Sequence, residues 1–198
     1  MRIFFEFDKV FIVKITNLNI DDVITIEPDL FLDKRGFFYE SFNFAKFCSV
    51  IKGDISFVFD CESLSKKGTI RGLHYQKKPF EQGKLVRVVQ GAVYDVIVDL
   101  RMHSRTFGFK DMVTLSAENK KILWIPPGLA HGFQALEETT KMQYKITNFY
   151  EKSSEVTIKY NDPNLKIEWP ILDPIFMSEK DLKGLSFNEF IKIQKKND

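Results

Sequence analysis

Residues 68–100, GTIRGLHYQKKPFEQGKLVRVVQGAVYDVIVDL, combine short apolar alternations with reactive side chains. Apolar and polar residues alternate with a period of two, which is typical of β-strands. Burying many charged groups in a core is costly unless each has a partner. Between residues 71 and 87 this stretch nevertheless carries Arg71, His74, Lys77, Lys78, Glu81, Lys84 and Arg87. We therefore expect part of it to face a ligand or water.

The period of two continues on both sides of this stretch. The predicted strands are residues 55–59, 69–75, 84–90, 93–100, 111–115, 121–125, 132–136 and 141–147. Many short strands without intervening helices predict an all-β fold, either a sandwich, a barrel or a jelly roll. A helix is predicted for residues 43–51, with Asn43 as its N-cap.

The length of 198 residues predicts a single domain over residues 1–198, since no repeat or linker divides the chain. Residues 1–20 are interpreted as edge strands or as an extension that packs on a partner. Charged residues such as Glu6 and Lys9 break this segment into apolar runs too short for a signal peptide or a membrane span. Residues 178–198 are predicted to form one or two short helices.

Charge and cysteine content narrow the functional class. With 29 basic and 27 acidic residues the net charge is +2, which argues against nucleic-acid binding by bulk electrostatics. Cys48 and Cys61 show neither metal-ligand nor disulfide spacing, so the cytoplasm is the expected compartment.

The three histidines are His74, His103 and His131, and none lies close in sequence to another. A metal-binding barrel would need ligands that converge on one ion, so we expect no metal. His74 and His131 are then candidates for a base or for hydrogen-bonding groups. The alternative for His74 is a core histidine bonded to the backbone, but nearby Arg71 and Lys84 favour a site.

Four further residues are open to two interpretations each. Tyr144 shares a strand face with Met142 and Ile146 and is expected inside the fold, as a site residue or as a core tyrosine. Lys84 either ends a strand in solvent or faces inward. Asp181 is either a site residue or part of a capping box with Ser178, and the local sequence favours the cap. His131 follows a rigid turn with two prolines, which either positions it for a site or forms a plain hairpin.

A set of ordered motifs resembles the dTDP-4-dehydrorhamnose 3,5-epimerase family over about residues 20–183. The motifs are DKRGFFYE (33–40), GTIRGLHYQ (68–76), QGKLVR (82–87), LSAENK (115–120), WIPPGLAHGF (124–133), YKITNFY (144–150), SSE (153–155), IEWP (167–170) and SEKD (178–181). The resemblance implies an all-β cupin-type jelly roll with a few short peripheral helices, and a homodimer that exchanges N-terminal strands. It also implies a nucleotide-linked 4-keto-6-deoxy sugar as substrate, with no cofactor, metal, membrane or nucleic acid involved.

The resemblance also implies residue roles. His74 would be the base at C3 and C5, Asp181 would orient it, and Tyr144 would be the acid on the opposite face. Lys84, with His131 nearby, would lie at the C4 oxygen or at adjacent hydroxyls. The expected substrate-binding residues are Arg71 and Lys180 for the diphosphate, and Arg35, Phe38, Glu40, Phe59, Cys61, Tyr150 and Glu155 for the nucleotide or its neighbours.

The family pattern has Gln and Asn where this chain has Phe59 and Cys61. Because the lost polar groups are expected near the nucleotide, a GDP- or CDP-linked hexose or heptose is the alternative to a dTDP-linked hexose, with epimerisation at C3 alone or at both carbons. Two alternatives from other classes are a non-catalytic cupin that binds nucleotide sugars and a metal-dependent cupin enzyme.

Overall fold

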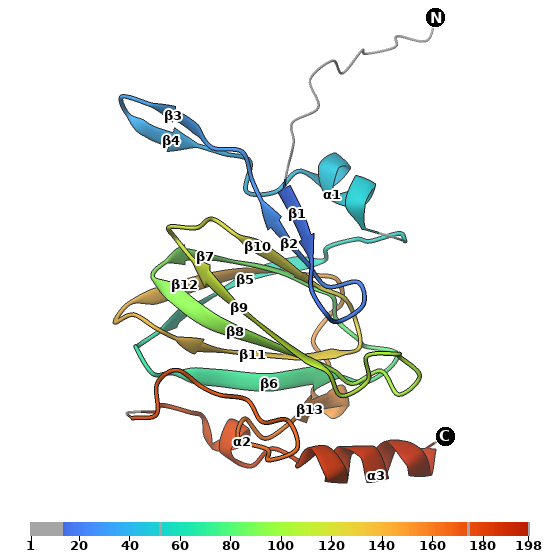
Figure 1. Cartoon of the computed structure of the whole chain (residues 1–198). Coiled ribbons are helices and arrows are strands. Elements are labelled where there is room, and N and C mark those ends of the chain that lie inside the picture. The colour runs from blue at the N-terminus through green and yellow to red at the C-terminus, as the bar shows by residue number, and fades with distance from the viewer. Residues whose placement is uncertain (1–13, 52, 174, 198) are drawn as a thin grey trace, which may run out of the picture.

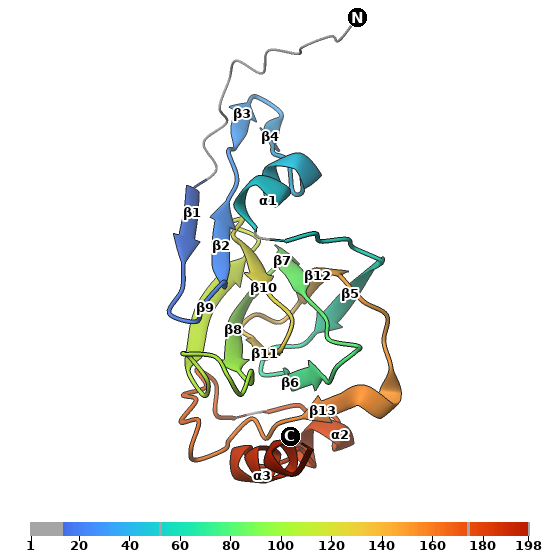
Figure 2. The same cartoon turned by 90° about the vertical axis from the view of Figure 1, so that its right-hand side faces the viewer.

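The computed structural model describes residues 14–51, 53–173 and 175–197. Its strands form two antiparallel sheets that face each other (Figures 1 and 2). The six-stranded sheet has the order β1 (Lys14–Asn17), β2 (Ile24–Glu27), β10 (Ile122–Ile125), β7 (Lys84–Gln90), β12 (Thr140–Ile146) and β5 (Phe59–Ser65). The five-stranded sheet has the order β13 (Glu155–Thr157), β6 (Ile70–Gln76), β11 (Leu129–Ala135), β8 (Ala92–Asp99) and β9 (Lys110–Ser116). The predicted all-β class is confirmed.

The space between the two sheets is filled by alternate residues of their strands. Val86, Val88 and Met142 from one sheet pack against Val93 and Ile97 from the other. All five are at most 2% exposed. Since side chains alternate across a strand, the same period carries polar residues of these strands into the interior as well.

Short helices cover the outer faces of the sheets. Helix α1 (Phe44–Val50) lies on the six-stranded sheet, where Phe47 packs against Trp124. As predicted, Asn43 caps it by accepting a hydrogen bond from the backbone N–H of Lys46. Helices α2 (Glu179–Leu182) and α3 (Phe187–Asn197) lie near β6 and β13 on the far side (Figure 2). Of the described helices, none combines the length and apolar character needed to cross a bilayer.

A two-stranded hairpin extends away from the sheets (Figure 1). It consists of β3 (Phe31–Asp33) and β4 (Gly36–Phe38). Its apolar side chains are exposed, with Leu32 at 77% and Phe38 at 68%. A 3₁₀ turn (Lys152–Ser154) precedes β13.

Two predicted strands differ from the observed ones. Residues 55–58 are irregular, because Phe57 packs its ring on Phe42, Phe47 and Trp124 instead of joining a sheet. The strand begins only at Phe59, and its inner face mixes Phe59 and Cys61 with Ser63 and Ser65, so the sequence shows no regular apolar alternation there. Strand β11 begins at Leu129, so His131 lies within the strand and not at its start.

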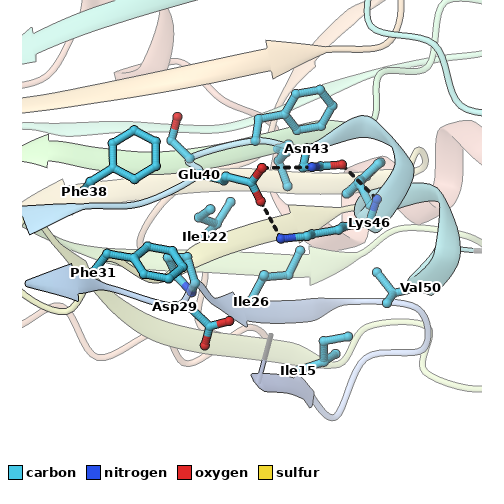
Figure 3. Close-up of a pocket in the computed structure, with 15 residues that line it drawn as sticks. Ile15, Ile26, Asp29, Phe31, Phe38, Glu40, Asn43, Lys46, Val50 and Ile122 are labelled. Atoms are coloured by element: carbon cyan, nitrogen blue, oxygen red, sulfur yellow. Dashed lines mark hydrogen bonds and ion pairs between the residues drawn. The ribbon is translucent and has the colours of Figure 1, made fainter. Parts of the chain in front are cut away.

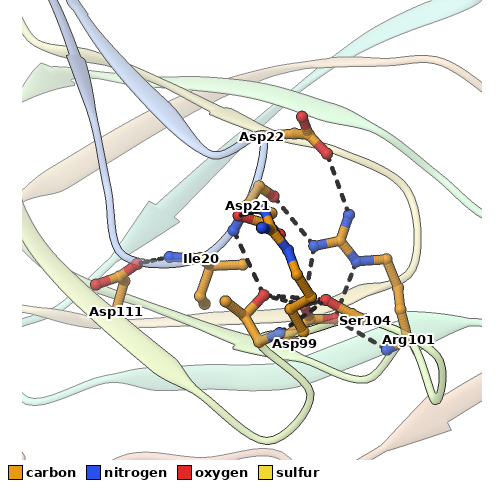
Figure 4. Close-up of polar contacts among 9 residues, drawn as sticks. Ile20, Asp21, Asp22, Asp99, Arg101, Ser104 and Asp111 are labelled. Atoms are coloured by element: carbon orange, nitrogen blue, oxygen red, sulfur yellow. Dashed lines mark hydrogen bonds and ion pairs between the residues drawn. The ribbon is translucent and has the colours of Figure 1, made fainter.

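Hydrogen bonds around the buried carboxylate of Asp99 connect the β8–β9 loop to the loop that joins β1 and β2 (Figure 4). Asp99 is fully buried and accepts hydrogen bonds from Arg101, Ser104 and Thr106 at 2.6–3.0 Å. Arg101 in turn donates to the backbone carbonyl of Asp21 at 3.0 Å. Asp111 adds a second anchor by accepting from the backbone N–H of Ile20 at 2.7 Å. These contacts tie the β1–β2 loop of the six-stranded sheet to β8 and β9 of the five-stranded sheet.

Asp99→Ala is expected to lower the free energy of unfolding by about 3–5 kcal/mol, because it leaves several donors without their buried partner. Urea denaturation measures this change. The matched control is Asp60→Ala, which removes an exposed ion pair with Lys145 and is expected to cost about 0–1 kcal/mol. Equal losses for the two variants would contradict the assigned role of Asp99.

Candidate active site

An imidazole and a carboxylate from distant parts of the chain meet at the edge of the five-stranded sheet. His74 lies in β6, and its Nε2 is 2.6 Å from Oδ1 of Asp181 in α2. Asp181 is only 3% exposed and also accepts a hydrogen bond from the backbone N–H of Gly72 at 3.4 Å. Because an ionised carboxylate only accepts, Nε2 of His74 carries the hydrogen, and Nδ1 keeps a free lone pair.

The surroundings favour a neutral imidazole beside an ionised carboxylate. Burial lowers the pKa of His74, and the charges of Lys84 and Lys180 act in the same direction, against the opposite effect of Asp181. For Asp181, burial alone would raise the pKa, but the hydrogen bonds from His74 and Gly72 leave it below its ordinary value. His74 can therefore accept a proton at neutral pH.

The capping-box interpretation of Asp181 is only half right. Ser178 does cap α2, since its hydroxyl accepts a hydrogen bond from the backbone N–H of Asp181 at 3.1 Å. The Asp181 carboxylate, however, turns to His74 and Gly72. The local motif thus fixes the backbone of Asp181, while its side chain serves another element.

Tyr144 occupies the inner face of the opposite sheet. It lies in β12 and packs against the core cluster that contains Val86 and Met142. Its hydroxyl is 3.0 Å from Oγ of Ser63 in β5. Burial raises the pKa of Tyr144, so the phenol stays protonated at neutral pH. The charge of Asp95, from the other sheet, acts on this phenol, so the two inner faces share one site.

Lys84 lies on the same inner face, at the first position of β7. It pairs with Ile146 of β12, which in turn pairs with Phe59 of β5. Burial lowers the pKa of Lys84 to about 8, although the carboxylates of Asp95 and Glu155 oppose the shift. Its ammonium group therefore stays largely charged at neutral pH and is held in a poorly hydrated place.

A second histidine–aspartate pair lies beside the first. Nε2 of His131 in β11 is 2.9 and 3.0 Å from the two carboxylate oxygens of Asp95 in β8. Both residues are buried, at 4% and 0% exposure. Burial raises the pKa of Asp95, while His131 and Lys84 oppose that shift. As His131 pairs with His74 in the sheet register, the two imidazoles are neighbours on adjacent strands.

Two glycines allow β6 and β11 to approach closely at this point. A Cβ atom on Gly72 would lie 2.6 Å from Cα of Gly132, and one on Gly132 would lie 2.7 Å from the carbonyl oxygen of Arg71. Gly72 also has φ +120°, a conformation that side chains disfavour. The two glycines thus permit a close approach of β6 and β11, which brings His74 beside His131.

Charged and aromatic residues surround this interior. Nε of Arg71 donates to Oγ of Ser65 at 3.1 Å. Glu155 in β13 accepts from Lys180 at 2.7 Å and from the Tyr150 hydroxyl at 3.0 Å. Although burial alone would raise the pKa of Glu155, these two contacts leave it lowered.

Phe59 and Cys61 lie on the inner face of β5, the edge strand of its sheet. The Phe59 ring stacks on Phe149, with ring centroids 6.4 Å apart and planes 15° apart. Cys61 pairs with Tyr144 in the register of the sheet. Both residues therefore lie on the sheet that carries Lys84 and Tyr144.

Three predicted binding residues are not brought to this interior within one chain. Arg35 lies on the exposed hairpin and pairs with Asp33 at 2.5 Å. Phe38 and Glu40 line a cavity of about 260 Å³ between β2, the hairpin and α1 (Figure 3). Glu40 forms an ion pair with Lys46 there and accepts a hydrogen bond from Asn43.

Sequence reasoning missed two residues of the site, Asp95 and Ser63. A signal existed for Asp95, because it shares the inward parity of Val93 and Ile97 in an otherwise apolar strand. Ser63 had no such signal, since its strand was not recognised. Among the described residues, no three His, Cys, Asp or Glu side chains group together in a way that could hold a metal ion.

Comparisons with known proteins agree on one family. The family model described as dTDP-4-dehydrorhamnose 3,5-epimerase matches residues 17–189. The chain is 50% identical to the dTDP-4-dehydrorhamnose 3,5-epimerase of Pseudomonas aeruginosa, over 88% of this chain and 96% of that protein. It is 48% identical to the enzyme of Shigella flexneri, with the same coverage. A Legionella pneumophila epimerase solved in complex with dTDP-4-keto-L-rhamnose has a TM-score of 0.85 at 45% identity, covering 89% of this chain and 93% of that one. The similarity to this solved structure supports the assignment of the fold as a jelly roll.

The amine of Lys84 is expected to titrate near pH 8, below the ordinary value of 10.5, because burial disfavours its charged form. NMR titration of lysine-labelled protein measures this value, and the signal that disappears in Lys84→Gln identifies the residue. A Lys84 signal that titrates near 10.5 would contradict the burial of the ammonium group.

Proposed function

The chain belongs to the dTDP-4-dehydrorhamnose 3,5-epimerase family, and we propose that the facing inner surfaces of its two sheets convert dTDP-4-dehydro-6-deoxyglucose to dTDP-4-dehydrorhamnose. The protein is an isomerase of nucleotide sugars. The observation that carries the residue assignment is the His74–Asp181 pair on one sheet with Tyr144 on the other.

Proton removal is assigned to His74. Its free Nδ1 accepts the proton from C3, and in a second round from C5, since both carbons flank the C4 ketone. The bonding electrons move into the ketone to give an enolate, so the substrate itself is the electron sink. Asp181 holds the imidazole by its Nε2–H and favours the imidazolium that forms.

We assign to Lys84 the stabilisation of the negative charge that develops on the C4 oxygen, and His131 lies beside it. A fixed donor at such an oxygen typically lowers the barrier by about 3–4 kcal/mol. The buried ammonium of Lys84 is suited to this task because little water screens it. Because Asp95 accepts the Nε2–H of His131, Nδ1 of that ring is left as an acceptor, suited to a hydroxyl of the sugar and not to the C4 oxygen itself.

Inversion requires the new proton to arrive from the face opposite to His74. Tyr144 supports this role because it lies on the opposing sheet and stays protonated. Its O–H would give the proton to the enolate carbon and leave a phenolate, while the imidazolium of His74 holds the proton that was removed. Exchange of both protons with solvent restores the enzyme.

Binding of the nucleotide diphosphate is assigned to the residues around the interior. Arg71 and Lys180 supply positive charge suited to phosphate groups. Tyr150, whose hydroxyl is fixed by Glu155, and the stacked Phe59 offer flat surfaces near the nucleotide, with Cys61 beside them. The family relatives favour the dTDP-linked hexose over the GDP- or CDP-linked alternatives.

We further infer a homodimer in which the β3–β4 hairpin reaches the site of the second copy. The hairpin exposes Phe31 and Phe38 on one face and Leu32 and Phe37 on the other, and exposed apolar side chains gathered in this way mark an interaction site. It also carries Arg35 and Phe38, which lie away from His74 in their own chain.

A cytoplasmic location is in keeping with Cys48 and Cys61 being free thiols.

His74→Asn is expected to lower kcat by about 10²- to 10⁴-fold, because the general base is lost. NMR in deuterated water should also show the loss of solvent deuterium incorporation at C3 and C5 of dTDP-4-dehydro-6-deoxyglucose. The matched control is His103→Asn, which changes an exposed histidine of the β8–β9 loop and should retain full activity. Undiminished exchange in His74→Asn would rule out the assigned mechanism.

A mixture of the inactive variants His74→Asn and Arg35→Ala is expected to regain activity if the hairpin serves the second copy. After subunit exchange, a mixed dimer has one site in which both residues are intact. Random pairing then gives about a quarter of the wild-type activity. No recovery, in a mixture that sedimentation shows to contain mixed dimers, would place Arg35 outside the partner's site.

A further inference from the structure

We propose that Ser63 is a positioning residue that fixes the phenol of Tyr144 toward the substrate and stabilises the phenolate formed when it gives up its proton. This inference rests on the proposed function, in which Tyr144 is the acid. Neither the sequence motifs nor the family assignment gives Ser63 a role.

The contact joins two neighbouring strands on the inner face of the six-stranded sheet. Ser63 lies in β5 and pairs with Met142, the residue two positions before Tyr144 in β12. Its Oγ is 3.0 Å from the Tyr144 hydroxyl. Val86 and Met142 pack in the same cluster as the Tyr144 ring. Within the described part of the chain, the hydrogen bond of this phenol is with Ser63.

This bond matters because of the charge that catalysis creates. A phenol that protonates carbon becomes a phenolate, and burial makes that anion costly. The Ser63 hydroxyl can donate to the phenolate oxygen once the proton has left, and it can accept from the phenol before that. In line with this, the bond to Ser63 opposes the rise in the pKa of Tyr144 that burial causes.

The same strand supplies an internal contrast. Ser65, two residues further along β5, accepts from Nε of Arg71 at 3.1 Å. Arg71 is assigned to the diphosphate and not to the reacting carbons. Removal of the two hydroxyls should therefore affect different kinetic constants, although both belong to the inner face of one edge strand.

The experiment compares Ser63→Ala with Ser65→Ala in the full chain, using dTDP-4-dehydro-6-deoxyglucose. Ser63→Ala should lower kcat by about 10- to 100-fold with KM nearly unchanged, the effect of one hydrogen bond to a charged group. Ser65→Ala should mainly raise KM. Ser63→Thr keeps a hydroxyl and should recover most of kcat. Ser49→Ala, which removes a hydroxyl from the distant helix α1, is the control for the substitution itself.

Isotope exchange gives a readout that loss of packing would not move. In deuterated water, Ser63→Ala should still let His74 exchange substrate protons, while inversion slows. The ratio of deuterium in recovered substrate to product formed should therefore rise.

Two results would overturn the proposal while leaving the proposed function in place. One is an unchanged kcat in Ser63→Ala although Tyr144→Phe is inactive. The other is a parallel loss of exchange and inversion together with a lower melting temperature, which indicates a structural role. If instead Tyr144→Phe and His74→Asn both retain full activity, the proposed function itself fails.

Discussion

The hydrogen bond between His74 and Asp181 joins residues 107 positions apart and depends on most of the fold. His74 reaches it from β6, where Gly72 and Gly132 let two strands come unusually close. Asp181 reaches it from α2, whose first turn Ser178 caps. At 2.6 Å the contact fixes which nitrogen of His74 carries a hydrogen, and thus which one can act as a base.

The interior between the sheets is divided between packing and chemistry. Val86, Val93 and Ile97 fill part of this space with apolar contacts. Along the same strands, the inward positions also carry Lys84 and Asp95. A strand that contributes both to packing and to chemistry keeps its period of two, but some of its inward positions are polar and others are apolar. The rigid apolar part thereby holds the polar groups in place without contacts of its own to a ligand.

Burial and pairing decide the protonation states of the ionisable groups within this interior. Burial disfavours the charged forms of His74, Lys84 and Tyr144 and so keeps an imidazole and a phenol neutral. Asp181 stays ionised because it gains hydrogen bonds that offset its burial. A neutral base, a neutral acid and a weakly hydrated cation can therefore coexist at neutral pH, which is the set that proton transfer next to a ketone requires.

The sequence by itself determined the all-β class, the helix capped by Asn43 and the inward position of Tyr144, since period and local capping are short-range properties. Local pattern explained Asp181 as a cap residue, and only the resemblance to the family paired it with His74. The sequence analysis also missed β5 and Ser63, because the inner face of that strand mixes Phe59 and Cys61 with serines and shows no regular apolar alternation. Only the tertiary structure brought β5, α2 and β6 around one interior, since contacts between distant segments are decided by how the sheets pack and not by neighbouring residues.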